Sequence, residues 1–335
     1  MLDLSKKFHL FACCYPVKGA ARSIIYDVQR ESFDFITNDL FDILQLSGKA
    51  SISDIIDEYG QENAPIVNEY FEFLYSKDYI FFSELEPDVF PPINEEFEKP
   101  CVISNTSVEL STIDAFKMAM VALDNNGCEA LSIVAGNTSF ELLSNALDIV
   151  SRTHIRFVNI LADYADGTLG ELESLLGVYH NLSNIYLFNA PRNEELNSKY
   201  EYATAFLIEN SFENSGCGYI KPKYFSVNMD FFFESRSCNN CLNRKIHIDS
   251  LGNLKSCPFS NTIHGCISET PLDQVVSLPS YKKLASITKD EVETCKDCEF
   301  RYMCSDCRVF LKDKNNPLSK PLHCNYDPYT GKWGK

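Results

Sequence analysis

Cysteines are the residues of this sequence whose number and spacing most clearly indicate chemistry. There are 14 among 335 residues, and nine of them lie between Cys238 and Cys324. The stretch CKDCEFRYMCSDC, residues 295–307, holds four of the nine, separated by two, five and two residues. Thiolates bind zinc and iron–sulfur clusters, and close cysteines also form disulfides. This spacing alone therefore leaves three chemistries open.

Further cysteines lie on either side of that stretch. Ten residues separate Cys241 from Gly252, and four more separate Gly252 from Cys257. The segment HIDSLGNLKSCP predicts a strand, a tight turn at Gly252 and a return strand that delivers Cys257. With Cys238 just upstream and Cys324 near the C-terminus, the set comprises eight cysteines, enough for two sites of four thiolates each.

These positions resemble the signature of SPASM domains, C–x(9–15)–G–x4–C, gap, C–x2–C–x5–C–x3–C, gap, C. Such domains follow radical SAM barrels in peptide-modifying enzymes and carry auxiliary [4Fe–4S] clusters. The chain keeps the seven positions with one departure, because two residues rather than three separate Cys304 from Cys307. Cys238 resembles the additional upstream ligand that is found when two clusters are present.

The resemblance implies two [4Fe–4S] clusters, each with its own set of four cysteines. The ligands of the first would be Cys238, Cys241, Cys257 and Cys307. The ligands of the second would be Cys295, Cys298, Cys304 and Cys324.

The residue types themselves leave zinc open as the alternative, with Cys295, Cys298, Cys304 and Cys307 forming one of two sites. Disulfides are disfavoured, because clustered cysteines in a reducing compartment more often bind metal. The remaining candidates are not needed as ligands and are interpreted as ordinary core or surface side chains: His247, His264, Cys266, Cys13, Cys14, Cys101, Cys128 and Cys217.

The net charge and the hydropathy of the sequence limit the kinds of partner that we expect. The net charge of −17 disfavours nucleic acid, which needs a basic surface, and suits a neutral or basic peptide. The sequence contains no run of 18 or more apolar residues, so it predicts no membrane-spanning helix. The opening KKFHLFACCYPVKGAA has too short an apolar stretch for an export signal and is interpreted as a folded edge. We therefore expect a cytoplasmic protein.

Residues 1–92 predict a small winged-helix-like unit. A hairpin, three helices and a closing strand follow one another in RSIIYDVQRESFDFI, DLFDILQL, SISDIIDEY, IVNEYFEFLYSKD and YIFFSE. Asn38 is expected to cap the first helix, and Pro65 to lie in the first turn of the third. These helices are acidic, which argues against a DNA-reading helix. The proline-containing FPPINEEFEKP then predicts a linker.

Residues 93–220 predict alternating strands and helices, an α/β pattern that is typical of a parallel sheet. Four strands are expected, in CVISN, ALSIVA, IRFVNILA and NIYLFNA, which favours a partial (βα) barrel or an open layer. Radical SAM enzymes hold their cluster with CxxxCxxC after the first strand, and Cys101 stands alone there. S-adenosylmethionine cleavage is therefore not expected. Asp163 and Asp166 close a strand and are interpreted as solvated loop carboxylates.

The order of units resembles the SPASM protein of grasp-with-spasm peptide-maturation systems: a winged-helix unit, a partial barrel without its own cluster, and a SPASM tail in residues 221–335. The stretch FACCYPVKGAARSIIYDVQRESFDFITNDLFDIL resembles the opening of that group. The resemblance implies an accessory protein that acts with an ATP-grasp ligase on a ribosomally made precursor peptide. Its N-terminal unit would bind the leader peptide as an added strand at a sheet edge.

Two alternatives remain at this point. One is a true radical SAM peptide maturase with a cryptic first cluster. The other is a zinc-stapled adaptor without a redox role, in which the cysteines only hold a small domain together. A DNA-binding winged helix is a more distant third.

Overall fold

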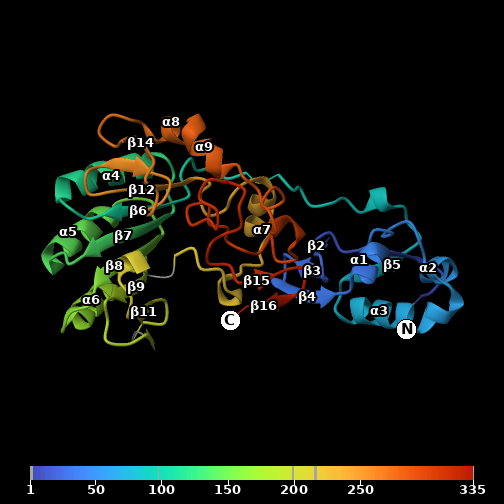
Figure 1. Cartoon of the computed structure of the whole chain (residues 1–335). Coiled ribbons are helices and arrows are strands. Elements are labelled where there is room, and N and C mark those ends of the chain that lie inside the picture. The colour runs from blue at the N-terminus through green and yellow to red at the C-terminus, as the bar shows by residue number, and fades with distance from the viewer. Residues whose placement is uncertain (1–2, 97, 198–199, 215–216, 335) are drawn as a thin grey trace.

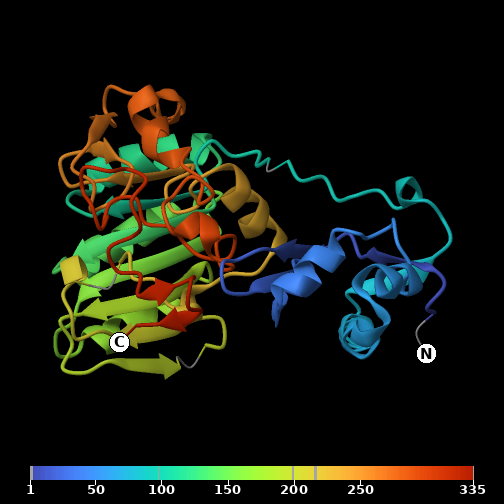
Figure 2. The ribbon, with the colours of Figure 1, turned by 45° about the vertical axis from the view of Figure 1, so that its right-hand side comes forward.

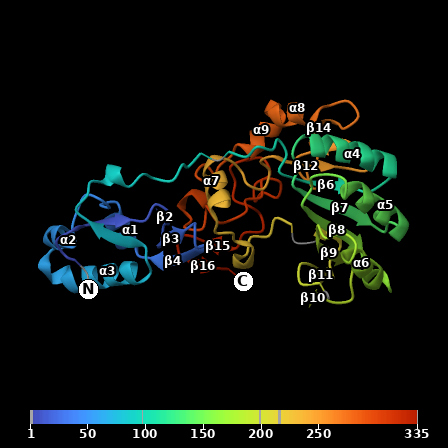
Figure 3. The ribbon, with the colours of Figure 1, turned by 180° about the vertical axis from the view of Figure 1, so that it is seen from behind.

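The structure is a computed structural model that describes residues 3–96, 98–197, 200–214 and 217–334. It has three parts in a row (Figures 1 and 3). The N-terminal helices lie at one end, a large α/β sheet lies at the other, and cysteine-rich loops lie between them. In the turned view of Figure 2 the cysteine-rich loops lie in front of the sheet. None of the helices in the described ranges is long and apolar enough to cross a membrane.

The N-terminal part contains two small antiparallel sheets and three helices. One sheet pairs β1 (Lys7–Leu10) with β5 (Ile80–Ser83), and the other has the order β2 (Cys14–Val17), β3 (Ser23–Asp27), β4 (Ser32–Ile36). Between β4 and β5 lie α1 (Asn38–Leu44), α2 (Ile52–Tyr59), the 3-10 helix η1 (Gln61–Asn63) and α3 (Ala64–Ser76); η2 (Pro87–Val89) follows β5. The predicted hairpin, three helices and closing strand are thus all present.

Local side-chain chemistry explains where these helices begin. The cap of α1 is Thr37, whose hydroxyl accepts from the Leu40 N–H at 3.1 Å. The prediction of Asn38 as this cap was therefore wrong by one residue, because Asn38 instead accepts from the Ser23 hydroxyl at 2.6 Å. Ser51 caps α2 through a reciprocal capping box with Asp54.

The α/β part is a nine-stranded sheet in the order β10-β11-β9-β8-β7-β6-β12-β13-β14. Its strands are β6 (Asn105–Glu109), β7 (Ala130–Gly136), β8 (Phe157–Asp163), β9 (Leu182–Phe188), β10 (Glu194–Asn197), β11 (Thr204–Leu207), β12 (Lys245–Ile248), β13 (Asn253–Lys255) and β14 (Ile263–Cys266). Strands β12, β6, β7, β8, β9 and β11 run parallel to their neighbours within this series.

Three helices cover the outer face of this sheet, while the cysteine-rich loops lie on its other side (Figure 1). The helices are α4 (Ile113–Asn125), α5 (Phe140–Val150) and α6 (Thr168–Leu176). They alternate with the strands β6 to β9, as the α/β pattern of residues 93–220 predicted. Alternate residues of the central strands are buried, for example Leu131 and Ile133 of β7, which places the main hydrophobic core beneath the helices.

The sheet differs from the prediction in two respects. The first strand is β6, at residues 105–109 rather than 101–105, because pairing with β7 begins only at Asn105. There are also two strands that the sequence pattern did not indicate, β10 and β11, of which β11 pairs in parallel with β9.

The sheet continues past residue 220, where the sequence predicted a boundary between domains. Strand β12 pairs in parallel with β6, and β13 and β14 extend the sheet antiparallel. The predicted tight turn is confirmed at Gly252, whose φ of +82° lies in the left-handed region that favours glycine. Cys257 follows β13 directly, as the strand–turn–strand prediction required.

The remaining elements are short. They comprise η3 (Phe212–Asn214), η4 (Pro222–Tyr224), α7 (Met229–Ser237), α8 (Leu272–Ser277), α9 (Pro279–Ala285), η5 (Cys295–Asp297), β15 (Tyr326–Asp327) and β16 (Lys332–Trp333). Residues 287–325, all of them described, contain only η5 and one isolated β-bridge. Regular hydrogen bonding therefore contributes little to holding this segment in place.

The N-terminal hairpin β3–β4 docks on that irregular segment. The Tyr26 hydroxyl donates to the Glu299 carbonyl at 2.7 Å, and Arg22 forms an ion pair with the buried Glu299 carboxylate at 2.8 Å. The ring of Phe300 packs edge-on against Phe35 of β4. The hairpin and the cysteine-rich loops therefore share one small core.

Replacing Tyr26 with phenylalanine is expected to lower the free energy of unfolding by about 1–2 kcal/mol, because it leaves the buried Glu299 carbonyl without this donor. Urea unfolding followed by circular dichroism measures the change. Tyr75→Phe is the matched control, since Tyr75 is 47% exposed on α3. Equal stabilities of the two variants would contradict the docking contact.

Candidate metal centres

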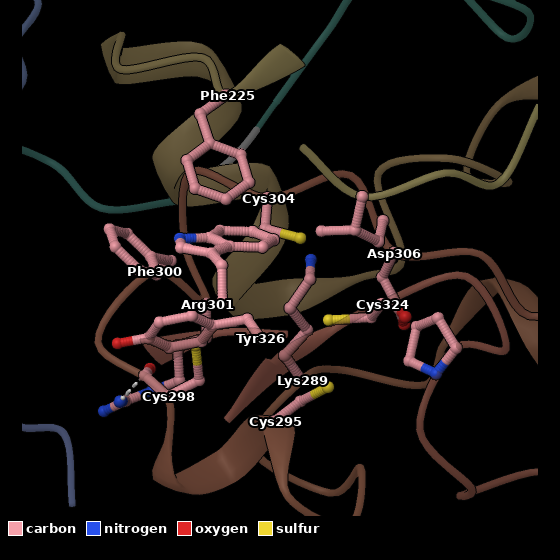
Figure 4. Close-up of a pocket in the computed structure, with 13 residues that line it drawn as sticks. Phe225, Lys289, Cys295, Cys298, Phe300, Arg301, Cys304, Asp306, Cys324 and Tyr326 are labelled. Carbon is pink, nitrogen blue, oxygen red and sulfur yellow. Dashed lines mark hydrogen bonds between the residues drawn. The ribbon is translucent and has the colours of Figure 1, made fainter. Parts of the chain in front are cut away.

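Four of the predicted ligands converge on one cavity. Cys295, Cys298, Cys304 and Cys324 all line a space of about 30 Å³ within the cysteine-rich loops (Figure 4). Cys295 begins η5, and the other three lie on irregular backbone. Much of the remaining wall is aromatic, with side chains from Phe225, Phe300, Tyr326 and Trp333. We name these four cysteines the second thiol group.

Burial makes these thiols weak acids when no metal is bound. It raises the pKa of Cys304 to about 12, and it raises the pKa of Cys295 and Cys298 strongly as well. The nearby Asp306 carboxylate raises the pKa of Cys295 and Cys304 further. Thiolates at neutral pH would therefore need a metal that replaces the protons.

A buried lysine points into the same space. Figure 4 shows the Lys289 side chain extending between Cys304 and Cys324. Lys289 is only 3% exposed, and its ammonium makes no hydrogen bond or ion pair with any residue in the described ranges. Its positive charge opposes the rise in the pKa of Cys304 and Cys295. A positive charge beside buried thiols makes this site electrostatically suited to an anionic occupant.

Three of the other predicted ligands also meet. Burial raises the pKa of Cys257 to about 12, and the charges of Cys241 and Cys307 raise it further. Cys241 likewise raises the pKa of Cys307. We name Cys241, Cys257 and Cys307 the first thiol group. It receives one ligand from each of three segments, after α7, after β13 and within the irregular segment 287–325.

The fourth predicted member, Cys238, lies at a different place. Its N–H closes α7 by donating to the Glu234 carbonyl at 2.7 Å. Its side chain lines a separate cavity together with Cys101 and Arg244. After burial, the groups that shift its pKa are Glu234 and Arg244 rather than a thiol of the first group.

A buried ion pair lies between the two thiol groups. Arg308 and Asp306 are joined at 2.6 Å, and both side chains are fully buried. Asp306 raises the pKa of Cys241 in the first group and of Cys304 in the second. The two groups thus share one charged interior, which sequence spacing did not indicate.

The thiols are more widely spaced than a single ion requires. Across the described part of the chain, the only group of three His, Cys, Asp or Glu side chains with ligand atoms all within 4.8 Å of one another is Cys13, Cys14 and Asp27. Four thiolates on one zinc stand about 4 Å apart, since Zn–S bonds are about 2.3 Å long. Neither thiol group has that spacing.

The Cys13, Cys14 and Asp27 group has a structural explanation. The Asp27 carboxylate accepts from the Gln29 and Arg30 N–H groups at 3.1 and 2.8 Å and from the Arg30 guanidinium at 3.1 Å. Its oxygens are thus already used to close the β3–β4 turn. Burial raises the pKa of Cys14 far above its ordinary range, in keeping with a neutral core thiol.

The histidines that the sequence analysis did not assign as ligands make hydrogen bonds with serine hydroxyls. His264 lies between the hydroxyls of Ser256 and Ser280, and His247 is hydrogen-bonded to Ser107 at 2.8 Å. All 14 cysteines are free in the structure.

The region of the missing radical SAM motif offers two thiols, Cys101 and Cys128, which are both buried. The Cys128 thiol donates to the Ala130 carbonyl at 3.3 Å. Asp163 accepts from the Asn189 side chain at 2.8 Å, and Asp166 is exposed, as expected for a loop carboxylate.

No protein-family model matches the sequence, and no curated protein matches it either. Among solved structures, Streptococcus suis SuiB aligns over 94% of this chain and 98% of its own when bound to S-adenosylmethionine, with 11% identity and a TM-score of 0.40. SuiB bound to its precursor peptide SuiA aligns over 93% of this chain and 98% of its own, with 11% identity and a TM-score of 0.40. SuiB alone aligns over the same shares, with 10% identity and a TM-score of 0.36. At these identities and TM-scores, the match assigns no ligand or activity to this chain.

Proposed function

We propose that this chain is an iron–sulfur protein of ribosomal peptide maturation. It holds two [4Fe–4S] clusters in residues 221–335 and binds a precursor peptide through residues 1–92, acting in the cytoplasm with an ATP-grasp ligase. The observation that carries the proposal is the second thiol group, in which four cysteines face one cavity beside the unpaired Lys289.

The charge of Lys289 supports a metal–thiolate occupant. A [4Fe–4S] cluster with four thiolates carries a net negative charge, which would be attracted to the positive charge of Lys289. The aromatic wall excludes water around such a cluster, which strengthens that attraction. In the free cavity, by contrast, the four neutral thiols leave the ammonium uncompensated.

The spacing of the thiols supports a cluster rather than zinc. A zinc ion draws four sulfurs into one coordination sphere, whereas each iron of a [4Fe–4S] cube takes its own thiolate. Cluster ligands therefore stand farther apart. No three of these thiols lie within 4.8 Å of one another in the described residues, which fits the wider arrangement. When bound, the clusters would supply one-electron chemistry or structural support.

Lys289→Met tests this occupant directly. It is expected to lower the reduction potential of the second cluster by about 40–90 mV, equivalent to about 1–2 kcal/mol at an effective dielectric constant near 20. The measurement is a potentiometric titration followed by electron paramagnetic resonance. Lys289→Arg retains the charge and is the matched control. If the cavity held no anion, Lys289→Met would instead make the protein more stable and leave its iron content unchanged.

The N-terminal hairpin supports peptide binding. Strand β4 lies at the edge of its three-stranded sheet, with β3 as its partner among the described strands. The C-terminal part of α3 lies beside it, because Lys77 pairs with Asp34 at 3.1 Å and the Thr37 and Tyr70 hydroxyls are hydrogen-bonded. An extended peptide could pair with the backbone groups on the side of β4 that faces away from β3. The net negative charge of the chain would favour a basic peptide.

Hydrogen exchange tests the peptide site. Candidate precursor peptides are expected to slow amide exchange in residues 32–36, because the added strand would pair with those amides. A scrambled peptide of the same composition is the control. Protection confined to other parts of the chain would contradict binding at β4.

The radical SAM alternative has little support in the thiols of the middle part. Cys101, Cys128 and Cys217 are the cysteines of residues 93–220, and the first two are buried near one another, whereas Cys217 lies near the first thiol group. A site-differentiated cluster needs three thiolates at one loop. The chain is therefore proposed as a partner protein that does not itself cleave S-adenosylmethionine.

A further inference from the structure

We propose that Cys217 is the fourth ligand of the first thiol group, in the place that sequence resemblance gave to Cys238. The inference rests on the proposed function, since it concerns the cluster that Cys241, Cys257 and Cys307 would hold. It names a ligand that no spacing motif contains.

The position of Cys217 is indicated by its neighbour Gly218, which packs against Cys307. Gly218 has a φ of +81° and lies so close to Cys307 that an added Cβ would stand 3.2 Å from that sulfur and 2.9 Å from the Phe310 ring. Glycine is therefore required there both by conformation and by space. The backbone that carries Cys217 thus packs directly onto a member of the first thiol group.

The other two thiols are also within electrostatic reach. Burial raises the pKa of Cys217 to about 12, and the charges of Cys241, Cys307 and Cys257 raise it further. These are the three members of the first thiol group. All three thiols therefore lie within electrostatic range of Cys217, which belongs to the segment between η3 and η4.

Cys238 lacks the corresponding surroundings. It is held at the end of α7, and its side chain faces the cavity that contains Lys99, Cys101 and Arg244. Two asparagines separate it from Cys241, and the first of them, Asn239, is anchored by donating to the buried Asp306 carboxylate at 2.9 Å. This anchored turn directs Cys241 and Cys238 to different sites.

The assignment has a chemical consequence. Four cysteines would ligate all four irons of the first cluster, so no iron would be open to a peptide or another ligand. The first cluster would then serve in electron transfer or structure. A ligand set with only Cys241, Cys257 and Cys307 would instead leave one iron open.

Cysteine alkylation of the iron-loaded, unmodified protein tests the assignment. The surface of Cys217 is exposed, so iodoacetamide can reach its sulfur unless a metal holds it; because its raised pKa slows the reaction of the free thiol, both samples are labelled for the same long time at alkaline pH. We expect mass spectrometry to find Cys217 unlabelled in the loaded protein and labelled after iron is removed with a chelator. Labelling of Cys217 in protein that retains its full iron content would overturn the proposal.

A pair of variants gives a second, independent readout. Cys217→Ala is expected to lower the iron content from about eight to between four and seven per chain, or to produce the spectrum of a three-iron cluster. Cys238→Ala is expected to retain about eight. The reverse pattern would return the ligand to Cys238. Wild-type protein without iron would instead refute the proposed function itself, so the two failures are distinguishable.

Discussion

Removing iron with a chelator under reducing conditions is expected to unfold residues 287–325 and to undock the N-terminal hairpin. Amide exchange in this segment should accelerate at least about a hundredfold, which is equivalent to about 2.7 kcal/mol. Only η5 and one isolated bridge order this segment by backbone pairing. It also contains Lys289, whose charge an unoccupied site would leave without an anionic partner, and the buried Arg308–Asp306 pair.

Hydrogen exchange followed by mass spectrometry measures this effect, with the α/β sheet as an internal control. Helices α4 and α5 and strands β7 and β8 have their own large hydrophobic core, so their exchange should remain slow. The hairpin should lose protection together with the segment, because Tyr26 and Arg22 bind Glu299 within it. Unchanged exchange in residues 287–325 after complete iron removal would mean that the metal is not what holds them.

Replacing Cys304 with alanine is expected to halve the iron content, from about eight to about four per chain. Cys304 lines the cavity of the second thiol group, and the loss of one of its four ligands exposes an iron in an otherwise buried cluster. The first thiol group is built from other residues, so its cluster should survive. Chemical analysis of iron and sulfide in anaerobically purified protein provides the measurement.

Cys266→Ala is the matched control for that variant. Cys266 belongs to the same cysteine-rich part, but its sulfur lies 3.2 Å from the Ser268 hydroxyl and outside both thiol groups. It should retain all of the iron. If both variants lost equal amounts, or if Cys304→Ala lost none, the second thiol group would not be a cluster site.

Sequence succeeded where the determining interactions are local. The helices of residues 38–76 follow from apolar periodicity, and Pro65 lies in the first turn of α3, as predicted. The one-residue error at α1 arose because Thr37 and Asn38 are both good caps, and only the long-range bond between Asn38 and Ser23 decides between them.

Sequence failed where distant segments meet. Strand β12 joins the sheet beside β6, about 140 residues earlier, and neither strand carries a signal for the other. Cys217 stands alone in the chain, so no spacing motif marks it, although the flanking glycines of GCG are a signal that could have drawn attention. Lys289 was missed because a lysine is exposed by default, and only its burial beside Cys304 makes it informative.

The most direct test of the central claim is the iron, sulfide and zinc content of anaerobically purified protein, together with its visible spectrum. Two clusters predict about eight irons and eight sulfides per chain with broad brown absorbance, and no stoichiometric zinc. About two zincs in a colourless protein would contradict the account, because the cysteine-rich part would then be a structural zinc domain.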